Sequence, residues 1–453
     1  MIHKFIQDDM KIVLDVNSGA VHVIDEMIYD ILDDYKEMHE EMIIQKLSSK
    51  YKKEEIVEGI EEIKILEKEG LLYTEDTYVH HPAFVNRNPV VKALCLHIAH
   101  DCNIRCKYCF ASQGDFKGHR SLMSEEVGKK AIDLLIENSG SRRNLEVDFF
   151  GGEPLMNFEV VKKIVDYGKE REKETNKRFR FTITTNGVLL DQKTIEYINE
   201  NMDNVVLSID GRKEVNDRMR YTINGNGTYD VIVPKFLEMA KQRRNKSYFV
   251  RGTFTRENLD FASDVLHLAD LGFKNTSVEP VVTDENNEYA IREEDLETIF
   301  QQYDLLAKEY IKRYREGNGF TFFHFMIDLN QGPCVIKRLS GCGAGVEYLA
   351  ITPEGDIYPC HQFVGNQDFY MGNVLNKTLE RDFQSYFGNA HIYNKEKCSK
   401  CWAKFYCSGG CHANAYNFHN DITKPYELGC EMEKKRIECS LAIQAKLLQE
   451  EDI

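Results

Sequence analysis

The thirteen cysteines of this chain are gathered into two segments, and this grouping restricts what the chain can fold into more than any other feature. Four lie between residues 95 and 109 and nine between residues 334 and 439, while the 224 residues between the two segments contain none. The first ten residues have no basic region followed by an apolar stretch, so we expect a cytoplasmic protein. Because thiols stay reduced in the cytosol, closely spaced cysteines indicate metal ligation rather than disulfides.

Length and charge narrow the possibilities further. A chain of 453 residues is too long for one hydrophobic core, so two or three domains are expected. No run approaches eighteen apolar residues, so the sequence predicts no membrane-spanning helix and no membrane partner. The formal net charge of -16 argues against a nucleic-acid partner, which would need a basic face.

Residues 1–80 are predicted to form a small separate unit. Residues 11–25 contain two β-rich runs on either side of Asn17-Ser18-Gly19, which is the pattern of a β-hairpin. Amphipathic helical patterns follow at 26–36, 38–50 and 53–69. Residues 81–92 have the composition of a linker.

Strand and helix patterns alternate from residue 93 to residue 285. This alternation predicts an α/β fold with a parallel sheet and right-handed crossovers. Six strand–helix units are fewer than the eight of a closed barrel, so an open, partial barrel is expected. Residues 286–333 are predicted as a helical bridge and residues 334–453 as a cysteine-rich domain. The six predicted strands are 93–100, 145–150, 179–184, 205–209, 248–255 and 275–281, with helices at 124–138, 157–174 and 258–270 among them.

The first cysteine group, Cys102, Cys106 and Cys109, directly follows the first predicted strand of this sheet. Parallel α/β folds place their functional sites at the C-terminal ends of strands. Three thiolates leave one iron of a cubane 4Fe–4S cluster without a protein ligand, and such an open site binds a substrate or cofactor. A zinc site remains an alternative, with a fourth ligand from His97, His100 or Cys95.

The arrangement Cys102-x3-Cys106-x-Tyr108-Cys109 resembles the signature of the radical S-adenosylmethionine superfamily. Three later strand ends carry segments similar to cofactor-contacting motifs of that family: Phe150-Gly151-Gly152-Glu153-Pro154, Thr185-Asn186-Gly187 and Ser208-Ile209-Asp210-Gly211. Glycines allow close approach of backbone carbonyls, and a glutamate supplies negative charge near an ammonium group. The resemblance implies a partial (β/α)6 TIM-type barrel in which S-adenosylmethionine is contacted by Tyr108, Phe110, Gly151, Gly152, Glu153, Pro154, Thr185, Asn186, Ser208 and Arg220.

The second cysteine group has the spacing Cys342-x12-Gly355-x4-Cys360, then Cys398-x2-Cys401-x5-Cys407-x3-Cys411, then Cys430. It resembles the SPASM domain of peptide-modifying radical enzymes, which holds two auxiliary 4Fe–4S clusters. The resemblance implies an outer cluster on Cys398, Cys401, Cys407 and Cys430 and an inner cluster on Cys342, Cys360 and Cys411. The fourth ligand of the inner cluster is Cys334 or an open position that accepts a substrate thiolate. Cys95 and Cys439 fit no motif and are expected to be small buried apolar residues.

The unit at 1–80 resembles a RiPP recognition element, which binds the leader of a ribosomally made precursor peptide as an added strand. The overall layout is similar to the maturases of cysteine-rich SCIFF peptides. That resemblance implies cleavage of S-adenosylmethionine by a reduced cluster, hydrogen abstraction from an acceptor residue such as threonine, and formation of a thioether of the sactipeptide or ranthipeptide kind. A reductant such as flavodoxin or ferredoxin is the implied second partner.

Other activities remain open at this point. His361 stands where sulfatase-maturing relatives have an aspartate proposed as a base, which counts against formylglycine formation, although histidine is itself a candidate base. Peptide epimerisation and other carbon–sulfur linkages are further alternatives within the enzyme class. A non-catalytic iron–sulfur or zinc protein that binds peptides or relays electrons is the alternative outside it.

Overall fold

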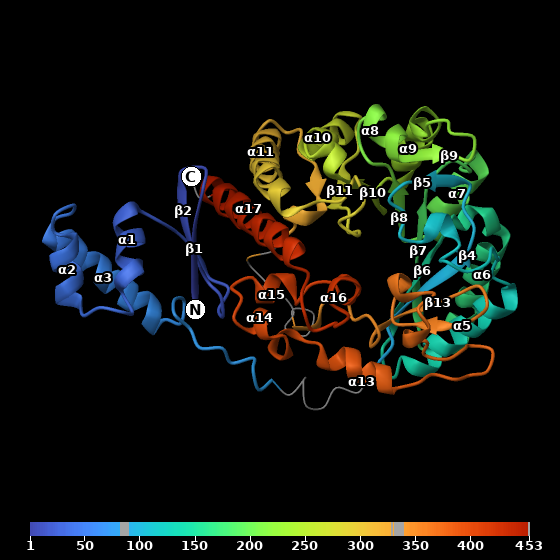
Figure 1. Ribbon diagram of the computed structural model, residues 1–453, viewed down its shortest axis with the longest axis horizontal. Coiled ribbons are helices and arrows are strands. Elements are labelled where there is room, and N and C mark those ends of the chain that lie inside the picture. The colour runs from blue at the N-terminus through green and yellow to red at the C-terminus, as the bar shows by residue number, and fades with distance from the viewer. Residues whose placement is uncertain (82–89, 328, 330–338, 452–453) are drawn as a thin grey trace.

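The computed structural model describes residues 1–81, 90–327, 329 and 339–451. Cys334 and most of the predicted linker at 81–92 lie outside the described residues. Figure 1 shows three parts: a small N-terminal unit, a curved sheet surrounded by helices, and a C-terminal part that lies between them. No helix of the described chain is long and apolar enough to cross a membrane.

The N-terminal unit is an antiparallel sheet followed by three helices. The predicted hairpin is confirmed as β2 (Met10–Asp15) and β3 (Val21–Ile24), and β1 (Ile2–Gln7), which was not predicted, pairs with the other side of β2. The three predicted helices are confirmed as α1 (Glu26–Asp34), α2 (Glu40–Leu47) and α3 (Lys53–Lys68). They bury a common apolar core that includes Ile31, Ile43, Ile56 and Ile60.

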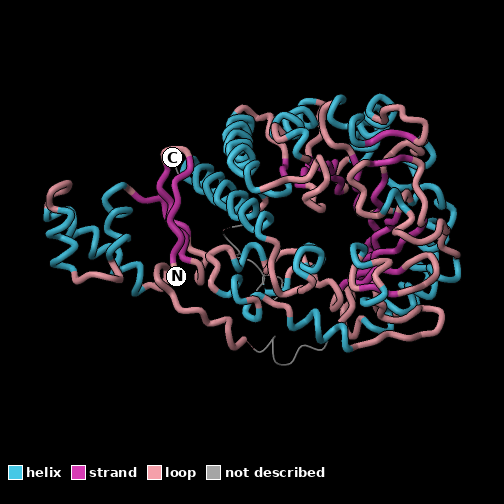
Figure 2. The backbone as a smooth tube through the Cα atoms, viewed as in Figure 1, coloured by secondary structure: helices cyan, strands magenta, loops and turns pink. Residues whose placement is uncertain are grey.

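The central sheet contains all six predicted strands, each parallel to its neighbours. The sheet is curved, with its strands on the inside of the curve and helices covering its outer face (Figure 2). The strands are β4 (Ala93–Ala99), β6 (Asn144–Gly151), β7 (Arg178–Thr185), β8 (Asn204–Ser208), β10 (Ser247–Phe254) and β11 (Asn275–Pro280). The helices are α5 (Glu125–Asn138), α6 (Phe158–Glu174), α7 (Gln192–Asn201), α8 (Lys213–Met219), α9 (Tyr229–Arg243), α10 (Phe261–Asp270) and α11 (Leu296–Arg315).

The sheet extends beyond the six predicted strands at both edges, and this corrects the expected strand count. β12 (Thr321–Phe322) adds to β11, so the sheet continues past residue 285. At the other edge β13 (Tyr348–Ile351) pairs in parallel with β4, and β14 (Ile357–Tyr358) pairs antiparallel with β13. Within the described residues the sheet runs from β12 to β14 without closing, so the barrel is open as predicted.

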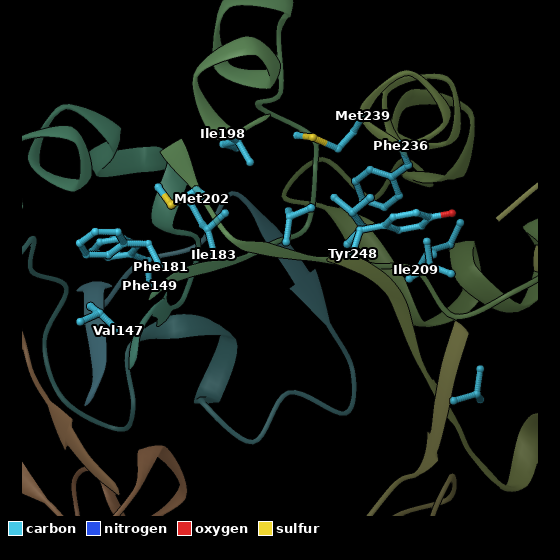
Figure 3. Close-up of a cluster of buried hydrophobic side chains, with 14 of the residues drawn as sticks. Val147, Phe149, Phe181, Ile183, Ile198, Met202, Ile209, Phe236, Met239 and Tyr248 are labelled. Carbon is cyan, nitrogen blue, oxygen red and sulfur yellow. The ribbon is translucent and has the colours of Figure 1, made fainter. Parts of the chain in front are cut away.

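Alternation along the strands separates a helix-facing core from an inner, polar face. Figure 3 shows Val147, Phe149, Phe181 and Ile183 packed in one buried cluster with side chains of α7 and α9 such as Phe236. Residues between them in sequence, such as Asp148 and Thr182, are half-buried and point to the inner side of the sheet. The inner side is therefore lined by polar groups suited to a bound ligand.

The C-terminal part consists of short helices and one long helix that contacts the N-terminal unit. Its helices are α13 (Asp382–Asn389), α14 (Glu396–Ser399), α15 (Lys404–Cys407), α16 (His412–His419) and α17 (Glu427–Glu451). The single-turn 3-10 helices of the chain are η1 (Ser112–Gly114), η2 (Pro154–Asn157), η3 (Arg256–Asn258), η4 (Glu293–Asp295), η5 (Phe323–Phe325), η6 (His361–Phe363), η7 (Gln367–Phe369) and η8 (Ile392–Asn394). His3 of β1 stacks on Trp402 with ring centroids 3.7 Å apart and lies 2.9 Å from the carboxylate of Glu438 on α17.

A buried ion pair fixes the end of the N-terminal unit to the C-terminal part. The Lys404 ammonium donates to the Asp76 carboxylate at 2.7 Å, and the Tyr393 hydroxyl donates to the other oxygen of that carboxylate at 2.7 Å. The Lys404 side chain is only 4% exposed. The N-terminal unit is therefore anchored directly beside the cysteines of 398–407.

Candidate functional site

The first cysteine group lies in the loop that leaves β4 at its C-terminal end. Cys106 ends the short strand β5 (Ile104–Cys106), which pairs antiparallel with β9 (Arg220–Thr222) so that Cys106 is opposite Arg220. Burial raises the pKa of Cys102 to about 11 and that of Cys106 to about 12, and the Cys109 thiol contributes to both increases. The three thiols therefore share one electrostatic environment at the strand end.

Three glycines bring backbone against this loop. A Cβ on Gly114, whose φ is +109°, would lie 2.9 Å from the Cβ of Cys102. A Cβ on Gly151 would lie 2.5 Å from the Ala99 carbonyl oxygen, and one on Gly152 only 2.0 Å from the Asp101 carbonyl oxygen. Only glycine fits at these two positions, so the Gly-Gly segment packs directly against the backbone of Ala99 and Asp101.

Glu153 ties the second motif to the third. Its carboxylate accepts hydrogen bonds from the Thr185 hydroxyl at 2.7 Å, the Asn186 backbone N–H at 2.8 Å and the Leu155 backbone N–H at 3.0 Å. Glu153 is 1% exposed, and burial raises the pKa of its carboxyl while these hydrogen bonds oppose the increase. Asn186 in turn reaches the cysteine loop, because its Nδ2 donates to Asn103 at 2.8 Å and lies 3.6 Å from the Cys102 Sγ.

Asp210 belongs to this network, although no role was assigned to it from the sequence. Both of its carboxylate oxygens accept the Tyr108 hydroxyl at 2.7 Å, and the Arg220 guanidinium donates to the Tyr108 oxygen at 3.0 Å. Burial raises the pKa of Asp210 to about 6, and the charge of Arg220 opposes the increase. In the sequence, the only sign of a role for Asp210 is its place in the segment Ser208-Ile209-Asp210-Gly211, which also contains the predicted cofactor contact Ser208.

Arg220 has a buried donor that the protein leaves unused. Its side chain is 6% exposed, and its Nε has no hydrogen-bond partner among the described residues. The positive charge lies close enough to Cys102 and Cys106 to oppose the increase in the pKa of both thiols. A buried cation with a spare N–H fits a ligand carboxylate, which is the group that S-adenosylmethionine would bring to this loop.

Phe110 and Ser208 are the remaining residues that the sequence predicted to contact the cofactor. Phe110 is 47% exposed and stacks on Phe150 with ring centroids 6.4 Å apart. Ser208 ends β8 on the inner side of the sheet, opposite Arg251 of β10. All the residues selected from the sequence for the cofactor therefore lie on the cysteine loop or on the ends of β6, β7, β8 and β9.

The structure does not favour the zinc alternative at the first group. His97 and His100 face each other, with Nδ1 and Nε2 3.0 Å apart, and both pack on Phe116. Cys95 contacts Tyr348 instead. Within the described residues no three His, Cys, Asp or Glu side chains converge on a position for a single metal ion. A cubane has no such requirement, because each thiolate binds a different iron atom.

The C-terminal cysteines can be compared with the two ligand sets that the resemblance implies. In the outer set, burial raises the pKa of Cys407 to about 12 and that of Cys430 to about 11, and other members of the same set contribute to both. A cavity of about 390 Å³ lies among these thiols, beside Trp402. The members of the outer set that line the cavity are Cys398, Cys401, Cys407 and Cys430.

The inner set consists of Cys342, Cys360 and Cys411. Burial raises the pKa of Cys360 and of Cys411; Cys411 and Cys342 contribute to the increase at Cys360, and Cys342 contributes to the increase at Cys411. Cys342 and Cys411 are exposed, whereas Cys360 is buried. Cys334, the candidate fourth ligand, lies outside the described residues. Cys95 and Cys439 are both buried, as expected for small apolar residues.

His361 lies between the first cysteine loop and the inner set. Its ring is 5.4 Å from Phe110 and 5.2 Å from Phe150, and its Nδ1 is 3.4 Å from the Tyr348 hydroxyl. Burial lowers the pKa of His361 to about 4, so the imidazole is neutral at pH 7. A cavity of about 350 Å³ opens beside it, lined also by Phe110, Phe116 and Asn417.

Comparison with known proteins agrees with this geometry. Residues 91–233 match the family of 4Fe-4S single cluster domains, and residues 342–402 match SPASM, an iron–sulfur cluster-binding domain. The radical SAM cyclopropyl synthase TigE of Paramaledivibacter caminithermalis is 24% identical over 92% of this chain and 89% of its own length. This chain is a radical S-adenosylmethionine (SAM) protein with a SPASM domain.

Solved structures share the fold of this chain over most of its length. A structure described as native anSMEcpe with bound AdoMet has a TM-score of 0.66 at 20% identity, covering 79% of this chain and 99% of its own. Streptococcus suis SuiB bound to precursor peptide SuiA has a TM-score of 0.53 at 17% identity, covering 93% and 97%. This radical SAM protein therefore combines a 4Fe–4S domain with a cluster-binding SPASM domain.

Proposed function

We propose that this radical SAM protein is a peptide maturase that forms a thioether between a cysteine sulfur and a carbon of another residue of a ribosomally made, cysteine-rich precursor. The observation that carries the proposal is the order of three sites along one molecule. A cofactor site at the β4 loop, the inner cysteine set and an anchored N-terminal sheet follow one another, with His361 between the first two.

We assign the first cluster to Cys102, Cys106 and Cys109, whose thiols lie together at the C-terminal end of β4. Arg220 is placed to hold the carboxylate of SAM, and Gly151-Gly152 to receive its amino group through backbone carbonyls. When bound, the cluster and SAM supply one-electron chemistry that removes a hydrogen atom from the substrate. Glu153 keeps the ends of β6 and β7 in register around the site through its three accepted hydrogen bonds.

We assign the outer auxiliary cluster to the outer cysteine set and the inner one to Cys342, Cys360 and Cys411. With three described ligands, the inner cluster has one position that either Cys334 or a substrate thiolate fills, and we favour the thiolate. Binding to iron keeps a sulfur deprotonated without a separate base. The neutral His361 is then available to orient the substrate by hydrogen bonding at the same cavity.

We propose that the leader of the precursor binds the N-terminal unit along β3. β3 is an edge strand of the three-stranded sheet, so its outer N–H and C=O groups are available for an added strand. Val23 on β3 and Leu71 after α3 are each 38% exposed and supply apolar contacts beside that edge. The description of SuiB with its precursor peptide, a protein of the same fold, supports a peptide partner. A reductant such as flavodoxin or ferredoxin completes the proposed set of partners.

The test is anaerobic reconstitution followed by mass spectrometry of a co-expressed cysteine-rich peptide encoded beside the gene. About twelve irons per chain are expected for three cubanes. A thioether removes two hydrogens per link and leaves one cysteine resistant to alkylation. A loss of two hydrogens with every thiol still alkylated would indicate a carbon–carbon link, and an unchanged mass with an altered residue would indicate epimerisation; either result overturns the thioether proposal.

Matched variants connect the product to the assigned sites. Cys411→Ala removes a ligand of the inner set and is expected to lower the iron content and abolish the link. Cys439→Ala removes a fully buried thiol that lies outside all three sets and is expected to retain both. Equal effects of the two variants would contradict the ligand assignment.

A further inference from the structure

Lys395 is a fully buried lysine in the middle of the C-terminal part. It immediately precedes α14, and its side chain is 0% exposed. Lysine is almost never buried without a partner, because an ammonium group loses much of its hydration free energy inside a protein. Its position therefore requires compensation by nearby groups.

The hydrogen-bond partners of the Lys395 ammonium are a backbone carbonyl and an imidazole. It donates to the Gly409 carbonyl at 2.8 Å and lies 3.4 Å from Nδ1 of His412. The His412 imidazole is itself buried. Gly409 has a φ of +88°, and a Cβ there would lie 3.5 Å from the Lys395 Nζ. The backbone turn between Cys407 and Cys411 is thus shaped around the ammonium.

The charged form of Lys395 is favoured by cysteines from both C-terminal sets. Burial lowers its pKa, and the opposing contributions come from two outer and two inner cysteines. The outer ones are Cys398 and Cys407, and the inner ones are Cys411 and Cys342. One buried cation thus lies within electrostatic reach of both sets.

We propose that Lys395 is a positioning residue that raises the reduction potentials of both auxiliary clusters. The inference rests on the proposed assignment of clusters to the two cysteine sets. Adding an electron makes a cluster more negative, and a fixed positive charge in a low-dielectric interior favours that state. Net charge and hydrogen bonding around an iron–sulfur centre are known determinants of its potential.

A higher potential at these clusters suits the proposed reaction. When a substrate thiolate joins a carbon radical, one electron must leave the substrate, and a nearby cluster of raised potential accepts it more readily. The electron balance is complete, because the accepting auxiliary cluster is reduced by the one electron that the new bond releases. A single cation close to both auxiliary clusters would favour transfer of this electron to either of them.

The test compares potentials of the reconstituted full chain by redox titration followed by electron paramagnetic resonance. Lys395→Gln keeps an N–H donor for Gly409 but removes the charge, and Lys395→Met removes both. Each is expected to shift the reduction equilibrium of both auxiliary clusters at least tenfold toward the oxidised form, which is 59 mV for one electron. Lys397→Gln is the matched control, because that lysine is solvent-exposed beside the outer cysteine set. It is expected to shift the equilibrium by less than threefold.

Iron and sulfide counts separate the possible failures. Neutral variants with full iron and unchanged potentials would overturn the role of Lys395 while leaving the proposed function intact. Wild-type protein with only about four irons would overturn the cluster assignment itself, and the role of Lys395 with it. If the neutral variants lose auxiliary iron, Lys395→Arg is expected to retain the iron and potentials within tenfold of wild type. Loss of iron from the Arg variant as well would overturn the proposal.

Discussion

The hydroxyl of Tyr108 lies 2.7 Å from both carboxylate oxygens of Asp210, although 102 residues separate the two in sequence. This contact joins the cysteine loop to the end of β8, and Arg220 completes it through the same hydroxyl. The aromatic residue of the cysteine motif therefore does more than fill space. Its hydroxyl donates to the buried Asp210 carboxylate and so offsets part of the free energy that this carboxylate loses on leaving water.

Tyr108→Phe is expected to lower the free energy of unfolding by about 1–3 kcal/mol, because Asp210 loses a donor that water does not replace. It is also expected to raise the pKa of Asp210 above about 6, since the Tyr108 hydroxyl lowers it. Anaerobic thermal unfolding measures the stability. Tyr314→Phe, at a side chain 52% exposed on α11, is the control and should change little. Equal stability of the two variants would show that the contact contributes nothing.

Glu153→Gln is expected to weaken SAM binding at least tenfold, or about 1.4 kcal/mol. The carboxylate accepts three hydrogen bonds, whereas an amide would point an N–H group at one of those donors. Equilibrium dialysis of SAM with the reconstituted protein measures the effect. Glu159→Gln, at the exposed start of α6, serves as the control. Unchanged affinity in the Glu153 variant would mean that the strand ends keep their positions without the carboxylate.

Asp76→Asn is expected to destabilise the chain by about 2 kcal/mol at pH 7. It removes the partner of the nearly buried Lys404, and the value is below that of a fully buried pair because Asp76 is partly exposed. Hydrogen bonds from Lys404 and Tyr393 lower the pKa of Asp76 against the opposing effect of burial. The contribution of the ionised Asp76 to the stability of the chain is therefore present above pH 3.8 and is lost as the pH falls below that value.

Chemical denaturation at several pH values measures this contribution. Glu427→Gln breaks the exposed pair with Lys397 in the same part of the chain and should have little effect at any pH. A loss for Asp76→Asn that persisted unchanged at pH 3 would contradict an ionic origin.

Asp148→Asn is expected to stabilise the chain at pH 7 and above. Burial raises the pKa of Asp148 to about 6 from 3.8, so ionisation of this carboxyl opposes folding. Each pKa unit corresponds to about 1.36 kcal/mol, which sets an upper limit of about 3 kcal/mol. Because the folded-state pKa is raised, the gain should grow from about pH 4 to about pH 6 and stay constant above.

The thermal midpoint of the reconstituted variant, measured across this pH range, tests the expectation. Asp166→Asn, on the exposed side of α6, should show no such pH-dependent gain. If the gain in stability from Asp148→Asn were largest at pH 4, the predicted direction of its pH dependence would be wrong.

Features that depend on local pattern were predictable from the sequence. The six strands followed from apolar alternation, and the placement of the Gly151-Gly152 and Thr185-Asn186 motifs at strand ends followed from those strands. β13 was missed because it has four residues and exists only by pairing with β4, about 250 residues away in the chain. Asp210 and Lys395 were missed for a similar reason, since their roles depend on contacts with Tyr108 and Gly409 that no local pattern records.

The pairing of β13 with β4 makes the SPASM domain inseparable from the barrel. β4 leads directly into the Cys102 loop, and β13 lies a few residues before Cys360, so one ladder of backbone hydrogen bonds sets the spacing between the first site and the inner set. The two sites therefore cannot drift apart by hinge motion while this ladder is intact. A chain cut before residue 340 would expose the edge of β4 as an open template for another strand. The distance between the first site and the inner set therefore depends on this strand register and not on linker length alone. An exchange of SPASM domains between relatives must accordingly preserve the register.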